Sequence, residues 1–231
     1  MIKKLFIASI LTILLSSCSS PPGTWGWYVI DPTTKGGYNN IWFLVSGFSA
    51  TIQLAVLAAF FSIILGLIVA LPGMSSNGWI RLPSRIYIEF IRAVPLLPML
   101  FWIFYGLPVI LKSMGLDIPI DAFWGSVVTL AISDSAFTAE IYRSGIQSIH
   151  KGQTEAALSI GLNRGLALRL VIIPQAMRAI VPTMISHWMN VVKNSSLAVA
   201  IGYSEITALF MQTSLNQSGY AIEIVALTML F

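Results

Sequence analysis

The chain has 231 residues, of which 56% are hydrophobic and 10% are charged, and its formal net charge is +4 at pH 7. Soluble domains average roughly 45–50% apolar and about 25% charged residues, so this composition is typical of a membrane protein. A nucleic-acid-binding face needs clustered basic residues with interleaved aromatics, whereas most aromatic residues here lie inside apolar runs. We therefore expect no nucleic-acid partner and attribute the excess of Lys and Arg to membrane topology.

The first 18 residues are predicted to be a signal-like leader. Two lysines precede the apolar stretch 5–15, which is short for a membrane span. The leader ends in Leu-Ser-Ser-Cys, which resembles a bacterial lipobox, so Cys18 is a candidate for lipidation after signal-peptide cleavage. The alternative is an uncleaved leader with an incidental cysteine. Residues 19–41 are expected to form an extracytoplasmic lead-in, and residues 42–231 a transmembrane domain.

About five transmembrane helices are predicted, because only helices satisfy their backbone hydrogen bonds inside hydrocarbon at these lengths. The predicted spans are 43–71, 86–111, 122–146, 177–200 and 219–231. The third span carries Asp134, Glu140 and Arg143. A charge at mid-membrane costs about 2.5–3.5 kcal/mol, so these side chains should face protein or water. We expect Glu140 and Arg143, three residues apart, to form a structural pair, and Asp134 to be either structural or part of a substrate path.

Basic residues predict which loops are cytoplasmic. Arg81 and Arg85 lie between the first two spans, and the long connection 147–175 is also basic. The opposite loops, 112–121 and 201–218, hold one Lys and three acidic residues. This layout places the C-terminus inside the cell. The last span ends without a basic residue, and we expect the C-terminus to be truncated.

The connection 147–175 contains a short predicted helix. Thr154 is the expected N-cap, and Glu155 is expected in the first turn, where the helix dipole favours an anion. Gly161 can take the left-handed conformation that ends the helix. Ala156 and Ala157 keep the surface low, so the backbone of another protein can approach closely.

A second predicted helix leads from this connection into the fourth span. Asn163 is its expected N-cap, and Pro174 is expected to interrupt it. Arg92, at the start of the second span, is expected to extend to the cytoplasmic interface. His150 and His187 lack a partner at metal-binding spacing, so no metal site is predicted.

Polar residues inside the fourth span predict where a solute passes. Buried polar groups at that depth need partners. Together with Asp134, the candidate path residues are Lys193, Asn194, Ser195 and Ser196.

Several segments carry a family resemblance. They are Glu155-Ala156-Ala157 with Gly161, Val171-Ile172-Ile173-Pro174, Ala50-Thr51-Ile52-Gln53, Arg92-Ala93-Val94-Pro95-Leu96-Leu97, Ala139-Glu140-Ile141-Tyr142-Arg143 and Lys193-Asn194-Ser195-Ser196-Leu197-Ala198. The chain resembles the permease subunits of bacterial ABC importers, in the polar amino acid uptake branch. The run Leu215-Asn216-Gln217-Ser218-Gly219 is similar to general L-amino acid permeases.

The resemblance implies an all-α membrane protein with the type I ABC importer permease fold, in the bacterial plasma (inner) membrane. The coupling helix, with Glu155, Ala156, Ala157 and Gly161, would dock on a cytoplasmic ABC ATPase subunit. A second permease subunit, identical or related, would complete the path, and an extracytoplasmic solute-binding protein would deliver the amino acid.

No cofactor is expected in this chain itself. It has no G-x-x-x-x-G-K-[ST] loop, so ATP and Mg would bind the partner ATPase. The sequence shows no pairing of a nucleophile with a base, so we do not expect an enzyme. The alternative function is a proton-coupled secondary transporter using Asp134 or Glu140, although such folds commonly show internal repeats and none is visible here.

Overall fold

The computed structural model describes residues 30–214, and within this range the regular structure is entirely helical. The predicted all-α class is therefore confirmed. The described residues form two compact units, one of residues 30–50 with 204–214 and one of residues 51–203. The leader, Cys18 and the predicted last span lie outside the described residues.

The first long helix, α2 (Lys35–Gly73), has 39 residues. At 1.5 Å per residue it is about 59 Å long, well beyond the roughly 30 Å of a bilayer core. The helix begins at Lys35, inside the expected lead-in 19–41, and the predicted boundary at residue 42 stays a prediction. The apolar sequence of α2 has no proline before Pro72, so nothing breaks the helix earlier.

The smaller unit is built around Phe210, which is fully buried and packs with Leu44 and Ile206. Glu205 is also fully buried, although the sequence placed it in an outer loop. Its Oε1 accepts hydrogen bonds from the backbone N–H groups of Thr207 and Ala208, at the start of the π-helix η6 (Thr207–Ser214). The carboxylate thus caps a helix inside this unit.

The predicted second span consists of two pieces. Helix α3 (Gly78–Ala93) ends at Val94, which is extended with φ −83° and ψ 124°. A residue before proline is disfavoured in the helical region, so Pro95 causes this break. The elements α4 (Leu96–Phe101), η3 (Trp102–Gly106) and α5 (Leu107–Ser113) then follow one another directly. The predicted second span is therefore broken at Pro95, one of the prolines expected to kink it.

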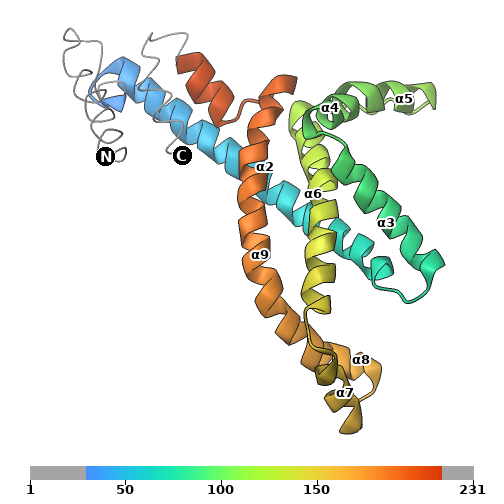
Figure 1. Ribbon diagram of the computed structural model, residues 1–231. Helices are drawn as coiled ribbons and strands as arrows, with labels where there is room; N and C mark the ends of the chain where they lie inside the picture. The colour runs from blue at the N-terminus through green and yellow to red at the C-terminus, as the bar shows by residue number, and fades with distance from the viewer. Residues whose placement is uncertain (1–29, 215–231) are drawn as a thin grey trace, which may run out of the picture. The chain divides into compact units, whose positions relative to one another are not determined.

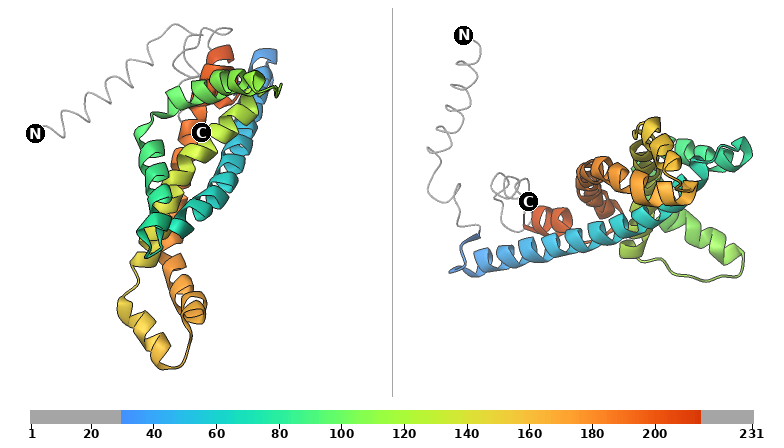
Figure 2. Two further views of the ribbon diagram at one scale, coloured as in Figure 1. Left: turned by 90° about the vertical axis from the view of Figure 1, so that its right-hand side faces the viewer. Right: turned by 90° about the horizontal axis from the view of Figure 1, so that it is seen from below.

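Helices α6 (Ala122–Gln147) and α9 (Ile173–Asn194) lie side by side within the larger unit (Figures 1 and 2). The short helices α7 (Lys151–Ser159) and α8 (Arg164–Ala167) lie at their common end. Helices α6 and α9 approach closely at Gly145, where an added Cβ would lie 2.2 Å from Cγ1 of Ile180. The main core of this unit also includes Leu54, Val127 and Val191.

Three helical stretches among the described residues are long and apolar enough to cross a membrane: Lys35–Gly73, Leu96–Ser113 and Arg164–Ile201. Helix α6 is long enough at 26 residues, but it carries the three charged residues noted above. Those charges find partners inside the larger unit, and these contacts form part of the candidate site.

Candidate transport path and coupling site

The predicted coupling helix corresponds to α7 (Lys151–Ser159). It begins earlier than predicted, because the imidazole Nδ1 of His150 accepts a hydrogen bond from Gly152 N–H at 3.1 Å. Thr154 therefore lies inside the helix, and its predicted capping role is wrong. Glu155 is also outside the first turn, so the helix dipole does not explain an acidic residue at this position.

The end of α7 matches the prediction. Gly161 has φ 87°, in the left-handed region. Leu162 N–H donates to the carbonyl of Ala157 at 3.2 Å, and Gly161 N–H donates to that of Leu158 at 3.0 Å. These two bonds form a Schellman motif, for which glycine is the favoured residue.

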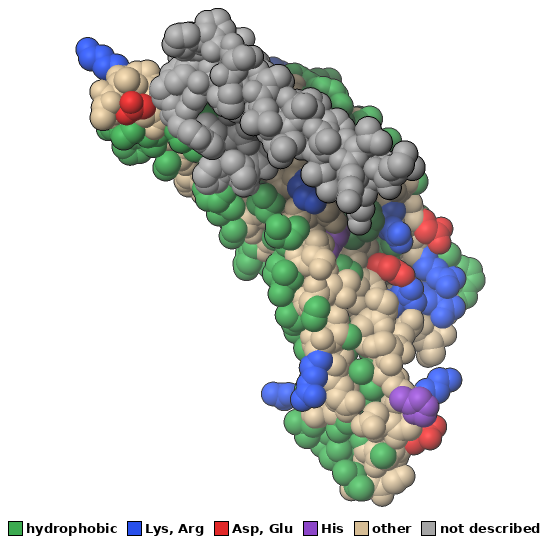
Figure 3. All heavy atoms as spheres, turned by 60° about the vertical axis from the view of Figure 1, so that its left-hand side comes forward, with side chains coloured by type: hydrophobic (Ala, Val, Ile, Leu, Met, Phe, Trp, Pro, Cys, Tyr) green, Lys and Arg blue, Asp and Glu red, His purple; other side chains and the backbone are tan. Residues whose placement is uncertain are grey.

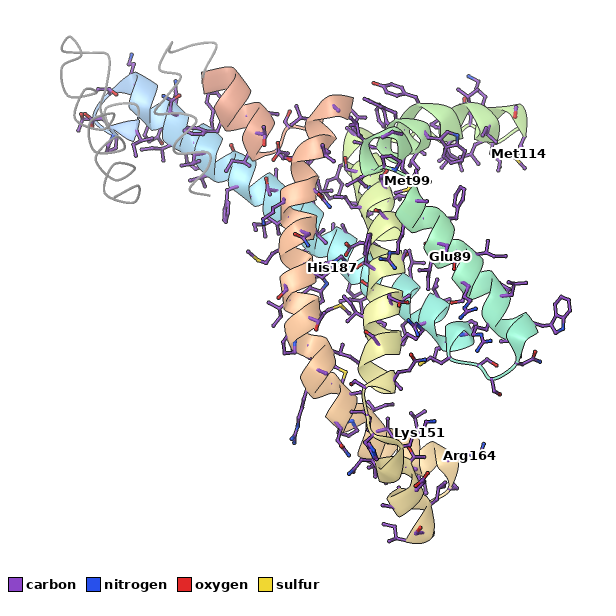
Figure 4. The ribbon with its side chains drawn as sticks, in the orientation of Figure 1. Glu89, Met99, Met114, Lys151, Arg164 and His187 are labelled. Carbon is purple, nitrogen blue, oxygen red and sulfur yellow. The ribbon has the colours of Figure 1, made fainter. Side chains whose placement is uncertain are left out.

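The two alanines of the motif face different ways. Ala157 is 3% exposed and packs within the chain, and its predicted docking role stays a prediction. Glu155 and Ala156 are exposed. Two large apolar side chains, Leu158 and Ile160, are exposed beside them, and Ile160 is 78% exposed. We call Glu155, Ala156, Leu158, Ile160 and Gly161 the coupling surface; Figure 4 shows Lys151 and Arg164 at the same end of the molecule.

The chain continues from this hairpin into α9 without a break. Asn163 Oδ1 accepts a hydrogen bond from Leu166 N–H at 2.9 Å and caps α8 (Arg164–Ala167), as predicted. A π-helical turn, η4 (Leu168–Ile172), then joins α8 to α9. Pro174 lies in the first turn of α9. Because a first-turn proline needs no intrahelical partner for its nitrogen, the predicted interruption does not occur.

A side-chain contact also joins the coupling helix to α9. Gln175 Nε2 donates a hydrogen bond to Gln153 Oε1 at 3.1 Å. Helix α7 is thus connected to α9 both by the intervening chain and by this side-chain hydrogen bond.

Asp134 on α6 has a partner that the sequence did not predict. Nε2 of His187 on α9 lies 2.6 Å from Oδ1 of Asp134, and both side chains are nearly buried. Figure 4 shows His187 between these two helices. Oδ2 of Asp134 has no hydrogen-bond partner among the described residues. The only signal in the sequence was that an acidic residue at this depth needs a partner.

Glu140 and Arg143 pair on α6. Arg143 Nε donates to Glu140 Oε2 at 3.0 Å, and Nη2 donates to Oε1. Nη1 of Arg143 donates to Gln147 Oε1 at 2.7 Å. Both carboxylate oxygens of Glu140 are therefore engaged by one guanidinium, which is the strong, bidentate form of such a pair.

Arg92 is exposed and also contacts an aromatic ring, while its predicted extension to the cytoplasmic interface stays a prediction. Its guanidinium carbon lies 5.1 Å from the centre of the Phe137 ring, which is within cation–π distance. The Phe137 ring in turn lies 5.4 Å from the His187 ring. Arg92 is thereby held against α6 near the end of α3.

Two polar cavities meet at Arg92 and Glu140. The first, of about 420 Å³, lies between the end of α2, α3 and α6, and its wall includes Arg81, Arg85 and Glu89. The second, of about 340 Å³, lies between α3, α6 and α9. On the face shown in Figure 3, basic and acidic side chains lie next to one another beside surfaces covered by hydrophobic ones.

The predicted path residues lie where α9 changes into the 3-10 helix η5 (Ser195–Ile201). Lys193 and Asn194 are exposed, whereas Ser195 is buried and donates to the carbonyl of Val192. Ser196 donates to the carbonyl of Lys193. Lys193 and Asn194 can therefore contact a solute, while the two serine protons are used locally. The substrate role of these residues stays a prediction.

Comparison with known proteins gives consistent matches. Residues 62–231 match the family described as "binding-protein-dependent transport system inner membrane component". The L-cystine transport system permease protein TcyL of Bacillus subtilis (strain 168) is 36% identical over 183 residues, covering 78% of this chain and 76% of that protein. The glutamine transport system permease protein GlnP of Escherichia coli (strain K12) is 34% identical over 182 residues, covering 78% and 76%.

Solved structures of ABC transporter chains also match this chain. A chain from the crystal structure of an amino acid ABC transporter with histidines has a TM-score of 0.72 and 36% identity, covering 84% of this chain and 89% of that one. A chain of the inward-facing MetNI methionine ABC transporter has a TM-score of 0.66 at 21% identity, over 82% and 88%, and shows the shared fold.

Proposed function

The chain belongs to the family of binding-protein-dependent transport system inner membrane components, and we propose that it carries amino acids across the bacterial plasma membrane. It has the type I ABC importer permease fold that the sequence predicted, and it is a membrane-embedded transport subunit. The relatives are permeases of ABC systems, and nothing in these matches supports a secondary transporter.

The observation that supports ATP-driven coupling is the connection between the coupling surface and the candidate path. Glu155 and Ala156 are exposed on α7, and the Gln153–Gln175 hydrogen bond ties α7 to α9. Helix α9 carries Lys193 and Asn194 at its other end. A displacement of α7 by a partner would therefore be transmitted along α9 to the path, as a rigid-body switch.

The partners follow from this scheme. A cytoplasmic ABC ATPase would hold ATP and Mg and contact the coupling surface. A second permease subunit would complete the path, and an extracytoplasmic binding protein would deliver the solute. The amino-acid class is supported by relatives named for L-cystine and glutamine transport.

Reconstitution with the partner ATPase and binding protein tests the proposal. Glu155→Arg and Gly161→Arg should insert normally, yet the variants should hydrolyse ATP without accumulating amino acid in the vesicles. Asp117→Arg is the matched control: it is also an acidic-to-basic change at an exposed position, but it lies outside the coupling hairpin, and it should leave uptake unchanged. Uptake by Glu155→Arg equal to the parent would overturn the docking assignment. Uptake that ignores ATP but collapses with the proton gradient would favour the secondary transporter instead.

A further inference from the structure

The cavity between α3, α6 and α9 has a chemically divided wall. One side carries the Arg92 guanidinium at the end of α3. The other side is lined by the hydroxyl groups of Ser144, Thr183 and Ser186 and the amide of Asn190. Its volume of about 340 Å³ is within the range of small-molecule sites, and it exceeds what one amino acid needs.

Arg92 shares this wall with one carboxylate, that of Glu140, which lies near enough to interact with it electrostatically. Within residues 30–214 it has no ion pair within 4.0 Å and no hydrogen bond. Its neighbour Glu140 uses both oxygens for Arg143. Stacking on Phe137 orients the guanidinium plane without using its N–H groups. Arg92 is exposed toward this open cavity, so its guanidinium N–H groups are available to an anion that enters.

The hydroxyl groups opposite have the complementary property. Ser144 donates to the carbonyl of Ile141, Thr183 to that of Ala179, and Ser186 to that of Pro182. Because each proton is committed to the backbone, each oxygen presents acceptor lone pairs to the cavity. Such a surface suits an ammonium group. The cavity therefore offers a donor fork for a carboxylate and acceptors for an ammonium, which is the pattern of a zwitterionic amino acid.

The cavity also lies in line with the candidate path. Thr183, Ser186 and Asn190 follow one another at spacings of three and four residues, so they share one face of α9. Asn194 is the next position of that series. Counted along α9 from the coupling hairpin, the cavity lies before the Lys193-Asn194 patch, toward the cytoplasmic end.

We infer that this cavity is a second, cytoplasmic-side binding subsite for the transported amino acid, with Arg92 receiving its α-carboxylate. This inference rests on the proposed function, because it takes the ligand to be an amino acid. The subsite holds the solute after it leaves the Lys193-Asn194 patch and before its release into the cytoplasm.

Protection of an introduced thiol tests the subsite in the complete transporter, solubilised in detergent. Ser186→Cys places a thiol on the cavity wall, and its alkylation rate is read by mass spectrometry of the peptide that contains it. Thr183→Cys provides a second reporter if the first variant does not fold. The probes are an equimolar mixture of the twenty L-amino acids, the member that the reconstituted transporter accumulates most, and the carboxamides of both.

We expect amino acids to slow alkylation and their carboxamides to have no effect. Arg92→Gln should raise the half-protecting concentration by about 10- to 100-fold, the effect of losing one charge-assisted hydrogen bond. Arg92→Lys should restore part of the protection, and Arg85→Gln, outside this cavity, should retain all of it. Equal protection by carboxamides, or unchanged protection in Arg92→Gln, would overturn the subsite.

The two proposals fail separately. Uptake without protection overturns the subsite and leaves the permease function standing. Protection by the mixture does not depend on uptake, so protection without ATP-driven uptake keeps the subsite and overturns the importer.

Discussion

The ionisable side chains of α6 each contact a specific neighbour. Arg143 holds Glu140 from one turn away on the same helix, a pairing that spacing alone predicted. Asp134 contacts His187 on a different helix, and no spacing rule connects two residues so far apart in the chain. Local pairs can be read from sequence because the helix fixes their geometry, whereas pairs between helices depend on packing.

Loss of the Asp134 carboxylate should destabilise the α6–α9 contact. Asp134→Ala leaves the nearly buried His187 without its partner, and an unsatisfied buried group costs about 1–3 kcal/mol. We expect a lower unfolding temperature for the detergent-purified transporter, with a smaller loss in Asp134→Asn, which keeps an acceptor oxygen. The neighbouring Ser133→Ala is the control. Equal temperatures for Asp134→Ala and the parent would show that the contact does not stabilise the fold.

The Glu140–Arg143 pair should behave as a coupled unit. Each side chain is about one-third exposed, so solvent partly screens the attraction between the two charges. An exposed ion pair contributes ~0.2–1 kcal/mol. Because the Glu140–Arg143 pair is bidentate, we expect its coupling energy to exceed that range. In a double-mutant cycle, Glu140→Gln and Arg143→Gln should each lower the unfolding temperature, and the double variant should lose less than the sum. Strict additivity would mean that the two side chains act independently.

At the scale of elements, the bounds of the coupling hairpin are set by the residues that begin and end its helices. The left-handed glycine at the end of α7 was predictable, because Gly161 follows a run of helix formers. The start of α7 was not, since a histidine nitrogen rather than the Thr154 hydroxyl caps it. The π-helical turn before Pro174 also carries no sequence signal, and it turns an expected break into a continuous connection.

The exposed side chain of Ile160, directly after α7, should contribute to ATPase binding. Full burial of a large apolar side chain contributes about 1.5–3 kcal/mol, so Ile160→Ser should weaken retention of the ATPase by roughly 10- to 100-fold. Retention is measured by pull-down of the solubilised transporter over a range of ATPase concentrations. Met114→Ser is the matched control, because Met114 is 71% exposed but lies in the loop after α5. A similar loss in both variants would refute a specific role for Ile160.

At the scale of the whole molecule, the basic residues of α3 and of the coupling hairpin predict the orientation in the membrane. Arg81, Arg85 and the coupling hairpin should lie in the cytoplasm, and the loop around Asp117 outside. The membrane character follows from composition alone. The prolines of the second span predict a kink, and the structure shows that the break falls at Val94, before Pro95.

Thiol accessibility tests this orientation. In intact spheroplasts, a membrane-impermeant maleimide should label Asp117→Cys and leave Ser159→Cys unlabelled until the cells are permeabilised. The label is read on the peptide that carries each substitution, so that Cys18 does not interfere. Labelling of both positions from the same side would refute the predicted topology.

The sequence by itself determined the membrane class, the helical fold, the family resemblance and the coupling motif, because each depends on composition or on residues close together in the chain. The tertiary structure decided which face of α7 is free, with Ala156 exposed and Ala157 buried. It also brought Arg92, Phe137 and His187 together from three helices. These contacts depend on how close-packed helices approach one another, at points such as Gly145, and that approach is set by many side chains acting together.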